Sequence, residues 1–281
     1  MCETPPARNL NGLRSSEFEL RNFLEGLYFA YNRRELADPD PLVFLYGYDD
    51  PLDREIVGLV ASSLAYGRVA QIMKSVEKVL APMGRNPHLF LLRRRLDPRG
   101  LWGGFKHRFT TGEQMAGLLA RTADALREYG SLEGLLGECL RRGGSLLSAL
   151  NLFSRALSPS GEGFPLLAAP EGGSACKRLL LYMKWMTRRD EVDPGGWTVI
   201  APKDLIMPTD THIHRIALQL GLTDRKQADL KTALEITQSF ARMVPEDPVR
   251  YDFVLSRFGI RRGMKASDLA ELRRTGATES L

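Results

Sequence analysis

Apolar residues recur at helical spacing through most of this 281-residue chain, and the strict apolar–polar alternation of a strand is almost absent. Proline and glycine turn chemistry separates the helical stretches, for example at 38–41, 84–87 and 193–196. The pattern therefore predicts an all-α fold, and we see no internal repeat. The expected helices cover residues 16–32, 51–66, 70–83, 112–128, 131–140, 146–157, 174–188, 211–220, 228–242 and 248–258.

Size and cysteine usage narrow the class of protein. With 43% hydrophobic residues, the chain can fill a sizeable core. No apolar run approaches the ~18 residues that span a bilayer, and the N-terminus lacks the basic-then-apolar order of a signal peptide. The three cysteines are scattered and form no cluster with histidine, which argues against a disulfide framework or a metal site. We expect a cytoplasmic protein that binds no membrane, metal or cofactor.

The charge balance is compatible with a polyanionic partner. The chain has 39 Lys+Arg against 34 Asp+Glu, a net charge of +5 and a pI near 9.2. Basic clusters lie at 93–95, 141–142, 188–189 and 257–265. Each cluster alone fits a solvated helix end, where cations complement the helix dipole, whereas several clusters on one face would form a phosphate-binding track.

The segment 208–215 (PTDTHIHR) places a carboxylate at the start of an amphipathic helix. After Asp210, apolar residues recur at positions 213, 216, 217 and 220, and Gly221 supplies the stop. Asp210 is therefore expected at or next to the N-cap, where free backbone N–H groups and the helix dipole favour the ionised carboxylate. An ionised carboxylate suits the stabilisation of a cationic transition state.

A second constellation lies at 172–186 (GGSACKRLLLYMKWM), where a glycine-rich turn precedes a stretch apolar enough for a buried helix. With Ser174 as the N-cap, Lys177 would lie in the first turn of that helix. The positive end of the dipole and partial desolvation there favour a neutral, nucleophilic amine. Such an amine can attack C1′ of a nucleotide or form a Schiff base with a sugar aldehyde.

Together these two motifs resemble the helix-hairpin-helix DNA glycosylase superfamily, which includes endonuclease III, adenine glycosylases and 8-oxoguanine glycosylases. There, a glycine-rich hairpin carries a lysine at the start of a buried helix, and a later Val/Leu-Asp-Thr-His-Val-x-Arg segment carries the catalytic aspartate. The resemblance gives the aspartate role to Asp210 and the nucleophile role of bifunctional members to Lys177. It covers about residues 20–262, and 58–83 resembles the helices beside the DNA wedge. More specifically, the chain resembles a bacterial family of unknown function.

The chain departs from the superfamily pattern in three places. The hairpin usually reads Leu-Pro-Gly-Val-Gly-x-Lys, but here Gly173 keeps the first glycine and Ala175 replaces the second, which weakens the case for a phosphate held by hairpin N–H groups. The stretch from Lys177 to Asp210 is longer than in endonuclease III, as in the archaeal 8-oxoguanine glycosylase group. The four-cysteine cluster of endonuclease III has no counterpart, so no iron–sulphur group is expected.

The resemblance implies a protein that binds double-stranded DNA and flips a damaged base, for instance an oxidised one, out of the stack. It would then cut the N-glycosidic bond of that base, and Lys177 could add a lyase activity. It implies two helical lobes around a cleft, one of residues 51–204 and one of residues 1–50 with 205–281. The protein is expected to be a monomer associated with the nucleoid. The expected DNA- or base-contacting residues are Tyr66, Gly173, Ser174, Trp185, Trp197, His212, His214, Arg215, Arg261 and Arg262.

Two other functions fit the same residues. One is a non-catalytic nucleic-acid-binding protein with the glycosylase shape, which the degenerate hairpin favours; the other is an enzyme for a different N-glycoside, such as a modified nucleoside or RNA base. His212 and His214 are not expected to bind a metal, because residues two apart on a helix point to different faces. The acidic pairs 49–50 and 246–247 are interpreted as helix caps, with Asp247 at the N-cap before Pro248.

Overall fold

The computed structural model describes residues 15–93, 100–159, 166–260 and 269 of the chain. These residues are mostly helical, which confirms the all-α prediction. In chain order the helices and strands are α1 (Ser15–Tyr31), α2 (Pro51–Ser63), α3 (Val69–Leu80), α4 (Pro87–Arg93), β1 (Lys106–His107), β2 (Thr110–Thr111), α5 (Gly112–Tyr129), α6 (Leu132–Gly143), α7 (Leu146–Ala156), α8 (Lys177–Thr187), α9 (Thr211–Leu220), α10 (Leu230–Met243) and α11 (Asp252–Ile260). Short 3₁₀ turns lie at Arg34–Leu36, Pro41–Gly47, Ala81–Met83, Pro170–Gly172 and Pro202–Asp204.

Three elements go beyond the sequence prediction. Helix α4 begins at Pro87, a position that the sequence pattern assigns to a turn. Strands β1 and β2 form an antiparallel hairpin of two residues each, which is too short to leave a visible alternation in the sequence.

Of the two acidic pairs predicted to cap helices, the pair at 49–50 does so and the pair at 246–247 does not. Helix α2 begins at Pro51, and the Asp50 carboxylate accepts a backbone N–H of its first turn. The prediction of a cap at Asp247 is wrong, because α11 begins only at Asp252. The Asp247 carboxylate instead accepts hydrogen bonds from the buried guanidinium of Arg188 at 2.8–3.1 Å. A charge-assisted, bidentate contact is stronger than a neutral N–H cap, so the ion pair determines where this carboxylate points.

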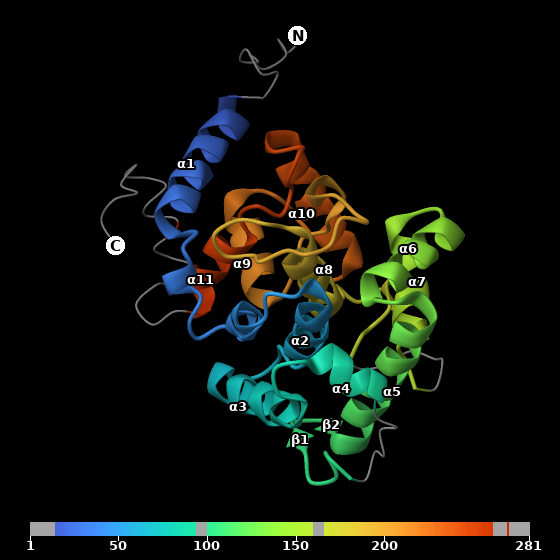
Figure 1. The fold of residues 1–281 in the computed structure, drawn as a ribbon. Coiled ribbons are helices and arrows are strands. Elements are labelled where there is room, and N and C mark those ends of the chain that lie inside the picture. Colours follow the sequence, from blue (N-terminus) through green and yellow to red (C-terminus); the bar gives the residue numbers. More distant parts are fainter. Residues whose placement is uncertain (1–14, 94–99, 160–165, 261–268, 270–281) are drawn as a thin grey trace, which may run out of the picture.

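Helix α8 lies near the centre of the fold, against α2 (Figure 1). Their contact is close at Gly58, where an added Cβ would lie only 3.2 Å from the ring of Tyr182 and 3.3 Å from the sulfur of Met186. Helix α2 also contacts α3 and α4, and α5, α6 and α7 pack in series along one side. Helix α1 packs against α10 and α11, so elements from opposite ends of the chain lie together. The division into two lobes stays a prediction.

Buried charges anchor the C-terminal half of α8. Lys184 Nζ lies 2.8 Å from Asp252 Oδ2 and 3.4 Å from Asp193 Oδ1, and all three side chains are almost fully buried. Burial disfavours the charged amine, but the two carboxylates outweigh it and raise the pKa of Lys184 to about 12. The Arg188 guanidinium similarly joins Asp193 and Asp247. Burying ions is costly unless they are paired, so this network holds α8, the 190–193 turn and α11 in one arrangement.

A further buried carboxylate joins α2 to α6. Glu55 Oε1 accepts the backbone N–H of Leu132 at 2.8 Å, and Oε2 accepts that of Glu133 at 3.2 Å and the indole N–H of Trp197 at 3.0 Å. Burial raises the pKa of Glu55 to about 7, although these three donors act in the opposite direction. The carboxyl group thus meets the free N–H groups at the start of α6, where a negative charge is favoured.

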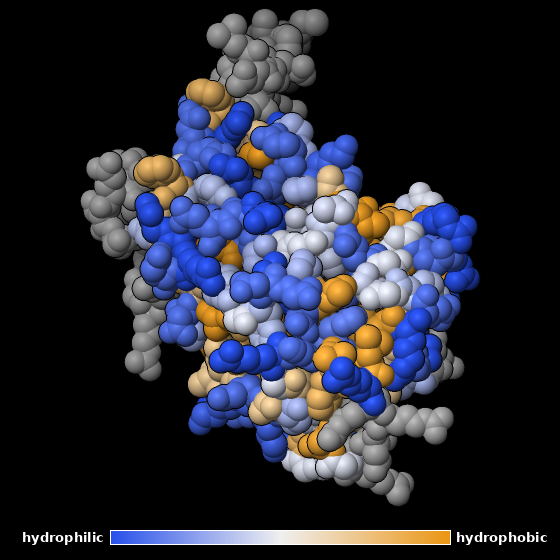
Figure 2. Space-filling model, in the orientation of Figure 1, coloured by the Kyte–Doolittle hydropathy of each residue, from blue (hydrophilic) through white to orange (hydrophobic). Residues whose placement is uncertain are grey.

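The surface seen in Figure 2 is largely hydrophilic, with hydrophobic residues in separate spots. Among the helices of the described ranges, none combines the length and apolar character required to cross a bilayer. Nor do three or more His, Cys, Asp or Glu side chains gather there in a way that could hold a metal ion.

Candidate functional site

Asp210 caps α9, as the sequence predicts, and its two carboxylate oxygens have different partners. Its backbone is extended, and Oδ1 accepts the backbone N–H groups of His212 and Ile213, both at 2.9 Å. Oδ2 points the other way and lies 2.9 Å from Lys177 Nζ. The carboxylate is therefore fixed to the helix by one oxygen and presents the other to the lysine.

Lys177 is the first residue of α8, three residues later than the predicted start of this helix. The prediction that Ser174 is the N-cap is wrong, because Cys176 occupies that position with a left-handed backbone (φ 47°) and no side-chain cap. Ser174 instead forms a bridge with Asp229, and the Gly173 carbonyl accepts the backbone N–H of Leu230. This bridge keeps the segment out of the helix until Lys177.

The Lys177–Asp210 pair is partly open to solvent, with 33% and 21% of the two side chains exposed. Burial alone would raise the pKa of Asp210, but the Lys177 ammonium, the Ile213 N–H and His212 lower it below its usual value. Asp210 is therefore ionised at neutral pH. The side chains of Lys177 and Asp210, 33 positions apart in the sequence, are thus in direct contact.

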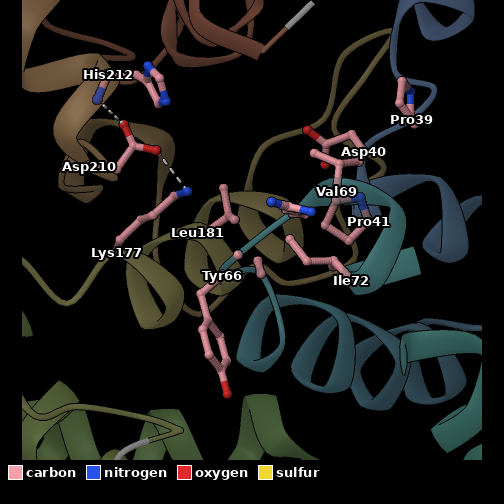
Figure 3. Close-up of a pocket in the computed structure, with 13 residues that line it drawn as sticks. Pro39, Asp40, Pro41, Tyr66, Val69, Ile72, Lys177, Leu181, Asp210 and His212 are labelled. Carbon is pink, nitrogen blue, oxygen red and sulfur yellow. Dashed lines mark hydrogen bonds and ion pairs between the residues drawn. The ribbon is translucent and has the colours of Figure 1, made fainter. Parts of the chain in front are cut away.

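The pair lies on the wall of a cavity of about 460 Å³, within the size range typical of small-molecule sites (Figure 3). In Figure 3, Lys177, Asp210 and His212 face Asp40 and Val69 across the space. The walls come from the 39–41 turn, from the loop between α2 and α3, and from the N-terminal turns of α3, α8 and α9. The lining residues are Pro39, Asp40, Pro41, Ala65, Tyr66, Gly67, Arg68, Val69, Ile72, Lys177, Leu181, Asp210 and His212.

A second, smaller cavity of about 50 Å³ adjoins the first, sharing Asp40, Lys177, Leu181 and Asp210 with it. Its lining includes Lys184 and Asp252, so it reaches from the site to the buried ion network. Space of this volume between polar groups is enough for ordered water.

Asp40 is the second carboxylate of the main cavity. Its Oδ1 accepts the backbone N–H of Leu42 at 3.0 Å, and its Oδ2 accepts from Arg257 at 2.7 Å. Arg257 is almost fully buried and comes from α11. Both carboxylates of the cavity are therefore paired with a cation, one with Lys177 and one with Arg257.

Among the predicted contact residues, Tyr66 and His212 line the cavity. The Tyr66 ring extends away from the Lys177–Asp210 pair (Figure 3). Its hydroxyl lies 2.8 Å from the carbonyl oxygen of His107, to which it donates, and 2.7 Å from Thr110 Oγ1. Tyr66 thus joins the cavity wall to the β1–β2 hairpin.

The remaining predicted contact residues lie elsewhere. Trp185 and Trp197 are buried; Trp185 borders the smaller cavity, and the indole of Trp197 donates to Glu55. His214 is buried on α9, with Nε2 at 2.7 Å from the Arg225 carbonyl oxygen. Exposed positions outside the cavity lining are Gly173, Ser174 and Arg215, and Arg261 and Arg262 lie outside the described residues.

Sequence reasoning missed Asp40, Arg68 and the apolar wall formed by Leu181, Val69 and Ile72. The sequence of the 38–41 segment, in which two aspartates alternate with two prolines, predicts only a turn. No local signal relates Asp40 to Arg257, its partner 217 positions away.

Residues 40–261 match the family described as "Protein of unknown function (DUF2400)". The chain belongs to this family. The DUF2400 match contains Lys177, Asp210 and every residue of the cavity lining except Pro39. The candidate site is therefore within the part of the chain that defines the DUF2400 family. No curated protein and no solved structure matches the chain.

Proposed function

We propose that this protein is a DNA N-glycosylase with lyase activity, which excises a damaged base flipped out of a DNA duplex. The observation that carries the proposal is the 2.9 Å contact between Lys177 and Asp210 on the wall of a cavity of about 460 Å³. A lysine that becomes a nucleophile once it gives up a proton, beside an ionised carboxylate, supplies the chemistry that cleavage at C1′ of a nucleotide requires.

Asp210 supplies the electrostatic part of the proposed reaction. As the N-glycosidic bond breaks, its electron pair leaves with the base, and positive charge develops on the sugar at C1′ and the ring oxygen. Asp210 is ionised because Lys177 and the start of α9 hold its pKa low, so it can stabilise this charge without first losing a proton. Its second oxygen holds it in place on α9.

Lys177 supplies the proton and then the nucleophile. In its ion pair the amine is an ammonium, and the departing base needs one proton. Transfer of that proton to the base leaves a neutral amine, whose lone pair forms the bond to C1′. Loss of a second proton from nitrogen and opening of the sugar ring, with a proton going to the ring oxygen, then give a Schiff base.

The cavity suits a flipped base flanked by a phosphate backbone. Leu181, Val69 and Ile72 form an apolar wall for the face of a base, and Arg68 places a cation at its edge. The net charge of +5 favours a polyanion such as double-stranded DNA. In this proposal the protein acts as a monomer at the nucleoid.

Borohydride trapping on labelled duplexes tests the proposal. The duplexes carry 8-oxoguanine, an oxidised pyrimidine, uracil or an abasic site, and base release is measured in parallel. Wild type is compared with Lys177→Ala, Lys177→Arg and Asp210→Asn, and Lys231→Ala on the exposed face of α10 is the matched lysine control. A trapped adduct that Lys177→Ala and Lys177→Arg both abolish, and that Lys231→Ala keeps, is expected.

Two other results would change the proposal. Base release without an adduct would make the enzyme monofunctional, with water as the nucleophile. Absence of adduct and release on every duplex, together with salt-sensitive DNA binding, would instead support a non-catalytic nucleic-acid-binding protein. The degenerate hairpin, in which Ala175 stands where the superfamily pattern has its second glycine, favours this second candidate. Turnover of free nucleosides without oligonucleotide binding would point to a different N-glycoside substrate.

A further inference from the structure

The β1–β2 hairpin lies at the edge of the fold (Figure 1), and its turn carries an exposed aromatic side chain. Arg108 and Phe109 form its two-residue turn, closed by the pairing of His107 with Thr110. The Phe109 side chain is 82% exposed. Because single exposed apolar residues are common on protein surfaces, the way in which this one is held matters more than its exposure.

The turn has an unfavourable sequence for its shape. Arg108 has φ of 53°, in the left-handed region that glycine and asparagine adopt most easily. Of the two turn residues only Arg108 has a positive φ, and two-residue hairpin turns with that conformation at the first position favour glycine there. The chain instead has an arginine and a phenylalanine here. Strained backbone at non-glycine residues is concentrated at functional sites, so the strain suggests a role for these two side chains.

The base of the hairpin is fixed to the wall of the candidate site. The buried imidazole of His107 lies 2.9 Å from Ser75 Oγ on α3 and 3.0 Å from the Tyr66 carbonyl oxygen. The Tyr66 hydroxyl contacts the hairpin from the other side. At Gly67, an added Cβ would lie 2.8 Å from Arg108 Cδ, so the arginine lies across the loop that lines the cavity. The tip therefore keeps a fixed position relative to the Lys177–Asp210 cavity.

Three cations lie on the hairpin or on the loop that Arg108 crosses. Arg68, Lys106 and Arg108 are exposed, and within the described ranges none of them forms an ion pair. The carboxylates of the cavity are already paired, Asp210 with Lys177 and Asp40 with Arg257. The Arg108 guanidinium lies 5.5 Å from the centre of the Phe109 ring. An aromatic ring among unpaired cations matches the two components of a nucleic-acid strand, stacked bases and phosphates.

We propose that the Arg108–Phe109 tip is a DNA contact in which Phe109 stacks on a base next to the flipped nucleotide, while Arg68, Lys106 and Arg108 contact phosphates. The inference rests on the proposed function, from which it takes DNA as the partner. It adds a second DNA contact, outside the cavity. Stacking suits a partner of any sequence because each base has a π-face. The three cations give the contact its expected dependence on salt.

Fluorescence anisotropy with a labelled duplex that contains one tetrahydrofuran abasic site tests the inference. All proteins carry Lys177→Ala, so that binding is measured without turnover. Phe109→Ala and Phe109→Leu are each expected to weaken binding at least fivefold. Phe29→Ala is the matched control, because Phe29 on α1 is an equally exposed phenylalanine (81%) on another part of the surface, and it is expected to bind like the parent. Arg108→Ala is expected to lower the slope of log K against log salt by about one.

Several results would overturn the inference. Phe109→Ala binding as tightly as the parent, or no DNA binding by the parent, would remove the contact. Parent-like affinity of Phe109→Leu would overturn the stacking, because it would show that an apolar wedge between bases suffices without an aromatic ring. An unchanged midpoint of urea unfolding in each variant shows that weaker binding does not arise from misfolding. If Phe109 contributes to binding and the enzyme with Lys177 intact releases no base, the DNA contact stands and the glycosylase proposal fails.

Discussion

Glu55→Gln tests whether the buried carboxyl group between α2 and α6 controls stability. Burial raises its pKa from an ordinary value of 4.5 to about 7 in the folded protein. Between these two pH values the folded state holds its proton more tightly than the unfolded state. The contribution of Glu55 to stability is therefore greatest below pH 4.5 and falls as the pH rises to 7. At ~1.4 kcal/mol for each pH unit, the fall amounts to about 3 kcal/mol.

Glutamine cannot titrate, so Glu55→Gln lacks this fall. Its amide also replaces an acceptor with a donor beside the N–H groups of Leu132 and Glu133, which adds an offset that does not change with pH. The free energy of unfolding of the variant, measured relative to wild type, is therefore expected to rise by about 3 kcal/mol from pH 4.5 to pH 7.5.

Urea unfolding at constant ionic strength and several pH values measures this difference. Glu77→Gln on the exposed face of α3 is the matched control, and its difference from wild type is expected to stay within about 0.5 kcal/mol. A difference for Glu55→Gln that does not vary with pH would refute the reasoning. It would mean that the three donors and the dipole of α6 keep Glu55 ionised throughout, despite its burial.

Substitutions at three further positions test the fold by urea unfolding. Lys184→Met removes the buried ammonium between Asp193 and Asp252 and is expected to cost about 3–5 kcal/mol; a loss below about 1 kcal/mol would mean that the network is not needed. Gly112→Ala places a Cβ against the carbonyl oxygen of Trp102 and is expected to cost at least about 1–3 kcal/mol, whereas stability equal to wild type would contradict this close packing. Asp210→Ala is expected to cost ~1 kcal/mol more than Asp210→Asn, which keeps a capping oxygen; equal stability would exclude the cap as a source of stability.

The parts of the site that depend on local chemistry could be predicted from the sequence. Asp210 precedes an amphipathic helix, and such a residue caps the helix wherever the rest of the chain lies. The contact between Asp210 and Lys177 joins distant segments, and the expectation that they act together came from the resemblance of both motifs to one superfamily. The structure brings them together.

The parts that depend on long-range contacts could not be predicted. Asp247 has every local feature of a cap, yet the guanidinium of Arg188 binds its carboxylate. Ser174 resembles an N-cap, yet its bridge to Asp229 delays the helix. Trp197, in a glycine-rich loop, suggested an exposed stacking residue, but its indole is buried against Glu55. In each case a partner far along the sequence provides a stronger interaction than the local one.

Helix α8 carries the candidate nucleophile at one end and the buried charges of Lys184 and Arg188 at the other. The buried ion pairs anchor the far end of α8, and the contact with Asp210 restrains the four methylene groups of the Lys177 side chain. Ordering a free lysine side chain costs up to ~2 kcal/mol in rotamer entropy. Here most of that ordering happens during folding, before any substrate arrives. A substitution in the buried ion network, without any contact to the substrate, would then slow a reaction by displacing its nucleophile, while substrate affinity stays almost unchanged.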